Sequence, residues 1–239
     1  MKVSVVVPAY NEEKLLPGTL ASIRAAMAAL GVDAELIVCD NNSTDRTAQI
    51  AREAGAIVVF EPINQISRAR NAGAARASGD WLIFVDADSH PSPELFADVK
   101  EQIAGGRCVA GGSTVVFDDA AAAPRFAVGA WNLLSRATRW AAGSFIFCET
   151  AAFRALGGFS TELYAGEEID LFRRLKRLAR RERRTIVILH RHPLVTSARK
   201  TKLYRWREHL AVLGKIVSTG GRSLRRRDSC FPWYDGRRE

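Results

Sequence analysis

The stretch Trp81–Asp88 (WLIFVDAD) decides the fold of this chain. Five large apolar residues in a row are typical of a strand that is buried on both faces of a parallel sheet. Pro91 and Pro93 follow closely, so the strand should end before them and leave Asp86 and Asp88 at its carboxyl end. Ligands of open α/β sheets bind at that end of the strands, and paired carboxylates suit Mg²⁺ or Mn²⁺. An Asp-rich turn that caps the next helix also explains the pair on its own.

The segments before this stretch alternate between strand and helix patterns. Short β-branched or apolar runs predict strands at residues 2–7, 35–39, 56–60 and 81–85. Helices are expected between them, the first with Asn11 as its N-cap and each closed by a glycine. This alternation predicts an α/β fold, with a doubly wound, mostly parallel central sheet and helices on both faces.

The second half of the chain is less regular. Strands are expected at residues 108–117, 143–149 and 185–189, and helices at 125–140, 150–156 and after 167. The apolar positions of the 125–140 helix predict that most of its large side chains belong to the core: Phe126, Trp131, Leu134 and Trp140.

Length and composition fit one large domain, or one domain with a tail. The chain has 239 residues, of which 47% are hydrophobic, and its apolar runs are shorter than the roughly 18 residues of a spanning helix. It begins with a strand, so we expect no signal peptide. Its four cysteines are widely spaced without a C-x-x-C pair, which is typical of reduced thiols in a cytosolic protein.

The charge is distributed unevenly along the chain. Residues 1–170 carry 14 Lys/Arg against 21 Asp/Glu, a net charge of −7. Residues 171–239 carry 21 Lys/Arg against 5 Asp/Glu, a net charge of +16. Such a basic segment predicts an anionic partner, namely phosphates, an anionic membrane surface or nucleic acid.

The phosphate-binding motifs of two large enzyme classes are missing from the sequence. It contains neither G-x-G-x-x-G after the first strand nor G-x-x-x-x-G-K-[ST] anywhere, so dinucleotide redox chemistry and P-loop hydrolysis are poorly supported. The predicted strands end in acids instead, Asp40 on one strand and Asp86 and Asp88 on another. Carboxylates in these places can hold a base N–H, a ribose hydroxyl and a cation.

Four stretches in this order resemble the family 2 glycosyltransferases of the GT-A fold: VVVPAYNEE (5–13), VCDNNSTDRT (38–47), SRARNAGAARASGDWLIFVDAD (67–88) and GGF…GEEIDLFRRLKR (157–177). The resemblance covers residues 2 to 180. It implies transfer of a sugar from a nucleotide-diphosphate sugar, usually with inversion, and a divalent cation, Mg²⁺ or Mn²⁺.

The resemblance also assigns roles to individual positions. It implies a nucleotide pocket lined by Pro8, Ala9, Tyr10 and Glu12. It further implies that Asp40 contacts the base, Arg70 lies near the base or phosphates, Asp86 faces the ribose and Asp88 the metal. Asp40 is also explained as an ordinary turn acid, and Asn41 and its neighbours as turn formers.

A second group of acids, Glu167, Glu168 and Asp170, begins a predicted helix. Acids are stabilised there by the helix dipole, so helix electrostatics alone also explain them. Glu168 stands where the family usually has an Asp, and an inverting transfer needs one carboxylate to accept the proton of the acceptor hydroxyl. We therefore expect Glu168 to be the base, with Glu167 and Asp170 on the acceptor or phosphate side.

Basic residues and histidines late in the chain are the last site candidates. By resemblance, Arg199 and Lys200 lie near the diphosphate or a phosphorylated acceptor, and His190 or, as the stronger candidate, His192 completes the metal shell. A purely structural histidine is the alternative.

Residues 203–217 predict an amphipathic helix, and a basic run follows at 222–227. Either this is a packed helix with a solvated tail, or it rests on an anionic membrane and presents the site to a lipid-borne acceptor. We therefore divide the chain into a catalytic domain, residues 1–200, and a basic amphipathic C-terminal part, 201–239. The donor half of the domain is 1–90, and the acceptor half 91–200.

Residue chemistry leaves several functions open beside an inverting transfer for cell-envelope glycan or glycolipid synthesis. A retaining sugar transferase or a nucleotidyltransferase shares the expected fold. A non-catalytic sugar-nucleotide, nucleic-acid or membrane binder belongs to another class, but the tail's aromatic residues stand beside its charges rather than between them, which disfavours nucleic acid. We expect a cytoplasmic protein, peripheral at the inner face of the membrane.

Overall fold

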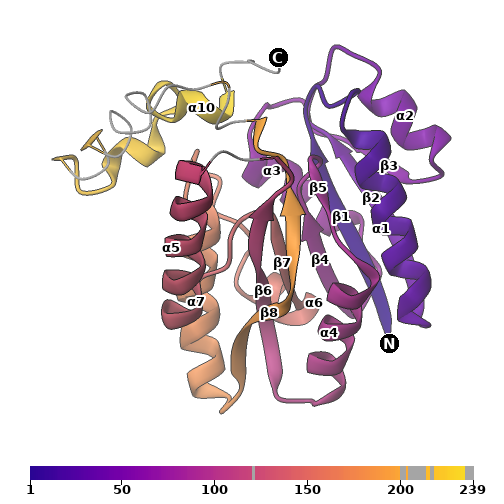
Figure 1. Ribbon diagram of the computed structural model, residues 1–239, viewed down its shortest axis with the longest axis vertical. Coiled ribbons are helices and arrows are strands. Elements are labelled where there is room, and N and C mark those ends of the chain that lie inside the picture. The colour runs from indigo at the N-terminus through magenta and orange to yellow at the C-terminus, as the bar shows by residue number, and fades with distance from the viewer. Residues whose placement is uncertain (120–121, 200–202, 204–213, 216–217, 235–239) are drawn as a thin grey trace.

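Eight strands assemble into one sheet in the order β3-β2-β1-β4-β7-β6-β8-β5, with helices packed on both faces (Figure 1). The structure is a computed structural model that describes residues 1–119, 122–199, 203, 214–215 and 218–234. The predicted helix at 203–217 lies almost wholly outside these residues. No helix in the described part of the chain is long and apolar enough to cross a membrane.

The donor half has the predicted parallel arrangement. Its strands are β1 (Lys2–Ala9), β2 (Asp33–Asp40), β3 (Ile57–Phe60) and β4 (Trp81–Val85), all paired in parallel. The helices between them are α1 (Leu16–Leu30), α2 (Thr47–Glu53) and α3 (Ile66–Arg76). The carboxyl ends of β1, β2 and β4 therefore meet at one edge of the sheet, as the alternating pattern predicts.

The acceptor half continues the same sheet with mixed directions. Its elements are β5 (Ser89–His90), α4 (Pro93–Ala104), β6 (Cys108–Phe117), α5 (Ala122–Thr138), β7 (Phe145–Glu149), α6 (Thr150–Ala155), α7 (Glu167–Arg181) and β8 (Thr185–Thr196). Strand β7 lies antiparallel between β4 and β6, whereas β8 is parallel to β6. The predicted parallel pairing thus holds for the first four strands, and the second half adds antiparallel pairs. The sequence pattern did not predict these pairs, because an apolar run does not encode strand direction.

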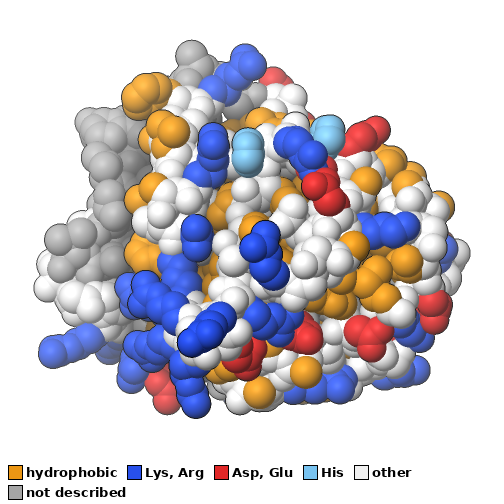
Figure 2. Space-filling view, turned by 90° about the horizontal axis from the view of Figure 1, so that it is seen from below, with side chains coloured by type: hydrophobic (Ala, Val, Ile, Leu, Met, Phe, Trp, Pro, Cys, Tyr) orange, Lys and Arg blue, Asp and Glu red, His pale blue; other side chains and the backbone are white. Residues whose placement is uncertain are grey.

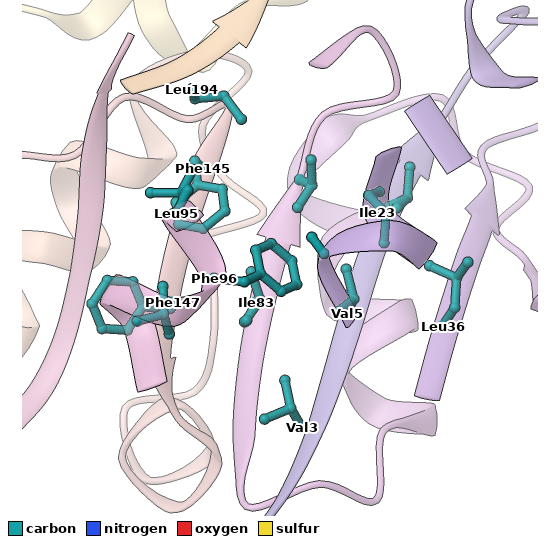
Figure 3. Close-up of a cluster of buried hydrophobic side chains, with 14 of the residues drawn as sticks. Val3, Val5, Ile23, Leu36, Ile83, Leu95, Phe96, Phe145, Phe147 and Leu194 are labelled. Atoms are coloured by element: carbon teal, nitrogen blue, oxygen red, sulfur yellow. The ribbon is translucent and has the colours of Figure 1, made fainter. Parts of the chain in front are cut away.

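The core lies on both faces of the sheet because successive residues of a strand point to opposite sides. Val5 and Ile83 join one cluster under α1 and α4, with Phe96, Phe145 and Phe147 (Figure 3). The next residues along the strands, Val6 and Phe84, join the other cluster, with Phe153, Phe159 and Phe172. All five residues of β4 are buried, as the opening stretch predicts, so the carboxylates after it extend from a fully packed strand.

Three local expectations were wrong. Asn11 is not a helix N-cap, because it has a left-handed backbone (φ 51°) and α1 begins only at Leu16. Strand β8 continues past Leu189 to Thr196, where it pairs with Ser89. Helix α5 exposes much of its apolar surface: Phe126 is 82% exposed, Leu133 69% and Leu134 46%.

The described C-terminal residues form short helical turns beside the carboxyl edge of the sheet. They are η1 (Arg222–Arg225), η2 (Arg227–Cys230) and α10 (Phe231–Tyr234). In Figure 1 they lie above the end of α5, on the side where the donor strands end. All four cysteines are buried as free thiols, as their spacing predicts.

Candidate active site

A cavity that is open to solvent lies at the carboxyl edge of the sheet, where β1 and β4 end side by side. Its lining comes from the two strand ends, the loops after β1 and β2, the start of α3 and the C-terminal α10: Pro8, Ala9, Tyr10, Glu12, Asn41, Asn64, Ile66, Asp86, Ala87, Asp88 and Tyr234. Six residues predicted to bind donor or metal thus share one cavity: Pro8, Ala9, Tyr10, Glu12, Asp86 and Asp88.

The loops after β1 and β2 are hydrogen-bonded to each other above this edge. The backbone N–H of Asn11 donates to Ser43 Oγ (3.0 Å), and that of Thr44 donates to Asn11 Oδ1 (2.8 Å). The N–H of Glu12 donates to Thr47 Oγ1 (2.8 Å). The polar residues after the two strands therefore brace one wall of the cavity, which is why Asn11 is not available to cap α1.

Asn41, not Asp40, faces the cavity from the end of β2. Asp40 Oδ1 accepts a hydrogen bond from the N–H of Ser43 (3.0 Å), and this acid is not among the lining residues. The side chain of Asn41 donates to the carbonyl of Ile63 (2.6 Å) and accepts from the N–H of Gln65 (2.9 Å). Asn41 thereby positions the loop that leads into α3 as well as lining the pocket.

Arg70 lies beneath the cavity and joins three elements. Its side chain is 1% exposed and donates to Asp86 Oδ1 (2.9 Å), Glu167 Oε1 (2.7 Å) and the carbonyl of Gly143 (2.8 Å). Its guanidinium also lies over the ring of Phe159, 5.2 Å from the centroid. Burial alone would lower the pKa of Arg70, but the charges of Asp86 and Glu167 raise it, so the side chain stays cationic.

A close approach of α3 to the sheet brings Arg70 to this place. A Cβ on Gly73 would lie 2.4 Å from Val6 Cγ1, so only glycine allows the helix to pack this near β1. Arg70 stands one helical turn earlier and points along the sheet edge to Asp86. The SRARNAG stretch therefore supplies both the cationic side chain of Arg70 and the glycine that lets α3 pack close enough to the sheet to place it.

A second cavity adjoins the first, and Asp86 and Ile66 line both. Its lining includes Arg70, Gly143, Ser144 and the start of α7 with Glu167 and Glu168. Glu167 is buried against Arg70, whereas Glu168 is half-buried. Burial and the charge of Glu168 raise the pKa of Glu167, and burial, opposed by Arg70, raises the pKa of Glu168. These two carboxylates therefore retain a proton to higher pH than ordinary glutamates.

Arg199, just after β8, contacts two residues that line the cavity at the ends of β1 and β4, although it is not itself among the lining residues. Its guanidinium holds both oxygens of Glu12 (2.9 and 2.7 Å) and lies 3.6 Å from Asp88 Oδ2. Burial alone would lower the pKa of Arg199, but Glu12 raises it, so this side chain too remains cationic. Its Nε is buried without a hydrogen-bond partner among the described residues. The structure thus joins three predicted residues from sites far apart in the chain.

The remaining predicted residues lie elsewhere. His192 is not brought to Asp88: its Nδ1 lies 3.1 Å from Asp98 Oδ2 of α4. Asp170 pairs with Arg174 (2.7 Å) one turn along α7 and lines neither cavity. Lys200 lies outside the described residues.

The described residues contain no group of three or more His, Cys, Asp or Glu side chains that could hold a metal ion. Mg²⁺, however, is usually bound by one or two carboxylates together with water and substrate phosphates, not by an all-protein cage. Asp88, which lines the donor cavity, fits such a site if phosphate oxygens supply further ligands.

Five lining residues were missed by the sequence analysis: Asn41, Asn64, Ile66, Ala87 and Tyr234. Asn41 stands next to a predicted ligand and could have been included on that ground. Asn64 and Ile66 lie in the loop before α3, where the pattern marked only a helix start. Tyr234 lies 146 or more residues from the other lining positions, so no local signal connects it with them.

Comparison with known proteins agrees with this architecture. The family model described as "Glycosyl transferase family 2" matches residues 4–154. The undecaprenyl-phosphate 4-deoxy-4-formamido-L-arabinose transferase of Enterobacter sp. (strain 638) is 36% identical over 100 residues, which cover 39% of this chain and 31% of that protein. The chain thus spans less than half the length of the curated relatives that it matches.

Two solved structures share the fold. The crystal structure of S. aureus TarS 1-349 in complex with UDP-GlcNAc matches 99% of this chain and 73% of that one, with a TM-score of 0.66 and 20% identity. Glucosyl-3-phosphoglycerate synthase from Mycobacterium tuberculosis, with Mn²⁺, UDP and glucosyl-3-phosphoglycerate, matches 96% and 80%, with a TM-score of 0.63 and 22% identity. The fold is therefore the GT-A fold, and the chain belongs to glycosyl transferase family 2.

Proposed function

We propose that this protein transfers a sugar from a nucleoside-diphosphate sugar to an acceptor hydroxyl or phosphate oxygen, with inversion at the anomeric carbon. One observation carries the proposal. Asp86 and Asp88 line the cavity at the end of β4, and Asp86 also lines the adjoining cavity that contains Glu168. Asp86 therefore lies between the cavity that we assign to the donor and the cavity that contains the base. UDP-GlcNAc and UDP in the two solved structures support a uridine diphosphate donor.

The nucleoside lies in the cavity between the loops after β1 and β2. Asn64 supplies an amide group for a base, Tyr10 an aromatic face and Asp86 a carboxylate for ribose hydroxyls. Arg70 holds the Asp86 carboxylate in place through its 2.9 Å hydrogen bond. In this assignment Arg70 positions Asp86 and Glu167 and need not touch the donor itself.

The diphosphate lies near Asp88 and Arg199. When bound, Mg²⁺ or Mn²⁺ on Asp88 would supply positive charge to the departing diphosphate. Mn²⁺ and Mg²⁺ in structures of the glucosyl-3-phosphoglycerate synthase support this class of cation. Arg199 adds a second cation whose unpartnered Nε can donate to a phosphate oxygen. Its guanidinium then turns from Asp88 toward the phosphates.

Glu168 is the base. Both glutamates line the adjoining cavity, but Glu167 is buried and ion-paired with Arg70, whereas Glu168 is half-buried. Glu168 accepts the proton of the acceptor hydroxyl, the acceptor oxygen bonds to the anomeric carbon, and the bond from that carbon to the diphosphate breaks with its electrons on the diphosphate. Burial raises the pKa of Glu168 above its ordinary value, which makes the carboxylate a stronger base when it is ionised.

The acceptor is lipid-linked and the protein rests on an anionic membrane. Helix α5 carries no acidic residue, its exposed apolar residues include Phe126 and Leu133, and Arg125 and Arg136 flank them. Figure 2 shows Lys and Arg gathered on the side of the molecule where α5 and α7 lie. Apolar and basic residues on one exposed helix favour the interface of an anionic bilayer.

Beside α5, a basic cavity that is open to solvent suits lipid phosphates. Its charged lining is basic throughout: Arg139, Lys176, Arg180 and Arg184. Burial and the charges of Arg180 and Arg139 lower the pKa of Lys176, so an anion would relieve their repulsion. The undecaprenyl-phosphate transferase among the relatives supports a lipid-linked acceptor.

A thermal-shift screen of nucleoside diphosphates and their sugars, each with and without Mn²⁺, tests the proposal. We expect UDP or a UDP-sugar with Mn²⁺ to raise the Tm of the wild type, and Asp88→Ala to lose the Mn²⁺-dependent part of that rise. If no nucleoside diphosphate or its sugar shifts the Tm, the proposal fails.

A further inference from the structure

Residues 218–234 dock on the loop between α6 and α7. The N–H of Tyr164 donates to the carbonyl of Leu224 (2.7 Å), and the rings of Tyr164 and Tyr234 meet edge to face with centroids 5.5 Å apart. Cys230, Tyr234 and Ala165 form a buried cluster of their own, separate from the two clusters on the sheet. The C-terminal segment is therefore held by specific contacts on its inner side.

Tyr234 also reaches the start of α3. The N–H of Ile66, the first residue of that helix, donates to the Tyr234 hydroxyl at 3.4 Å. The first N–H groups of a helix have no partner within the helix, so the phenol satisfies one of them. Gln65, the preceding residue, donates to the carbonyls of Thr161 and Leu163 (2.8 and 3.0 Å). The start of α3, the α6–α7 loop and the C-terminal segment are thus tied together around one aromatic ring.

The same ring lines the donor cavity. Tyr234 is 8% exposed and shares the lining with Asn64, Ile66, Asp86 and Asp88. The matched family region ends at residue 154, so this wall comes from beyond it. Burial, with the nearby charge of Glu167, raises the pKa of Tyr234, so its phenol is neutral and carries no charge that would repel a diphosphate.

We propose that Tyr234 is a donor-binding residue, whose ring closes the nucleotide cavity from the C-terminal segment and packs against the base or ribose. This inference rests on the proposed function, since it takes the ligand of the cavity to be a nucleoside diphosphate. An aromatic face strengthens the binding of any base, because every base has a π face. The ring therefore adds affinity without selecting the base, whereas Asn64, which lines the same cavity, carries an amide that can select it.

The ring matters more than the hydroxyl, because the hydrogen bond that the hydroxyl accepts from the N–H of Ile66 is long (3.4 Å). Calorimetric titration of UDP in the presence of Mn²⁺ tests this with variants of the full chain. We expect Tyr234→Ala to weaken UDP binding roughly tenfold, as loss of a stacked aromatic ring does, and Tyr234→Phe to stay within about twofold of the wild type. Tyr234→Leu keeps apolar bulk against Ala165 and Cys230 but lacks the π face, so its affinity should fall close to that of Tyr234→Ala.

Control variants distinguish a failure of the role proposed for Tyr234 from a failure of the proposed donor site. Arg225→Ala, in the same segment, removes an exposed ion pair with Glu162 (3.3 Å) and should bind UDP like the wild type. Asp86→Ala should lose binding. Wild-type affinity in Tyr234→Leu beside a loss in Asp86→Ala would overturn the role of Tyr234 alone. Wild-type affinity in Asp86→Ala would instead overturn the donor site. Tighter binding in Tyr234→Ala would mean that the ring occupies the place of the nucleotide, which also contradicts the inference.

Discussion

Replacing Arg70 by Met should destabilise the protein more than any exposed charge change. Met keeps much of the apolar stem but removes the guanidinium that holds Asp86, Glu167 and the Gly143 carbonyl. Glu167 would then be a buried carboxylate without its cation, next to Glu168. Removing one partner of a buried ion pair typically costs about 3–5 kcal/mol, because the other charge stays buried and uncompensated.

For a chain of this length, that loss corresponds to a fall in Tm of roughly 10 °C. Thermal unfolding followed by circular dichroism at pH 8 and at pH 5 measures it. The loss should be smaller at pH 5, because without Arg70 the neighbouring carboxylates are protonated more readily and their repulsion disappears. Adding Glu167→Gln to Arg70→Met should restore part of the Tm, since it removes the buried charge.

Arg76→Met on the same helix is the matched control, because Arg76 is exposed at the end of α3. Its effect should stay within about 0.5 kcal/mol. A Tm of Arg70→Met within 2 °C of the control, where the magnitude above predicts roughly 10 °C, would refute the role of Arg70 as the charge that holds the site together.

Three further predictions follow from the acceptor half. Glu168→Gln should retain UDP affinity but slow sugar transfer by at least about 100-fold, the usual contribution of a general base, and near-normal turnover would place the base elsewhere. Because folding raises the pKa values of Glu167 and Glu168, the two groups contribute stability that is fully present at pH values below the ordinary pKa of glutamate. This stability is lost as the pH rises through the raised pKa values. Glu168→Gln should therefore raise Tm more at pH 8 than at pH 5, and an equal effect at both would contradict the shifts. The double variant Phe126→Glu/Leu133→Glu should reduce flotation of the protein with phosphatidylglycerol vesicles. The control Phe60→Glu, which changes an exposed aromatic residue on β3, should not reduce it. Equal flotation of the two variants would contradict the proposal that α5 contacts the membrane.

The strand ends were predictable because local patterns encode them. The apolar run before Asp86 requires burial on both faces, and the carboxylates after it must then lie at the sheet edge with the ends of β1 and β2. Glu168 was placed beside this edge by resemblance alone. The structure distinguishes the two acids by their burial, because Glu167 is buried and ion-paired with Arg70, whereas Glu168 is half-buried.

The parts of the site that could not be predicted depend on contacts between segments that are far apart in the sequence. Tyr234 enters the donor cavity through packing on Tyr164, and Arg199 reaches Glu12 across 187 positions. Neither contact has a periodic signal. The exposure of Phe126 could not be read from its helix pattern either, because an apolar stripe predicts burial without saying whether protein or lipid covers it.

Calorimetric titration of UDP into the wild type and into Asp88→Asn, each with and without Mn²⁺, tests the central claim most directly. That claim is a nucleoside diphosphate between the ends of β1 and β4, with its phosphates at Asp88. We predict Mn²⁺-enhanced binding in the wild type and little enhancement in Asp88→Asn, which keeps the size of the side chain but loses its charge. Equal Mn²⁺ enhancement in both proteins would contradict the claim.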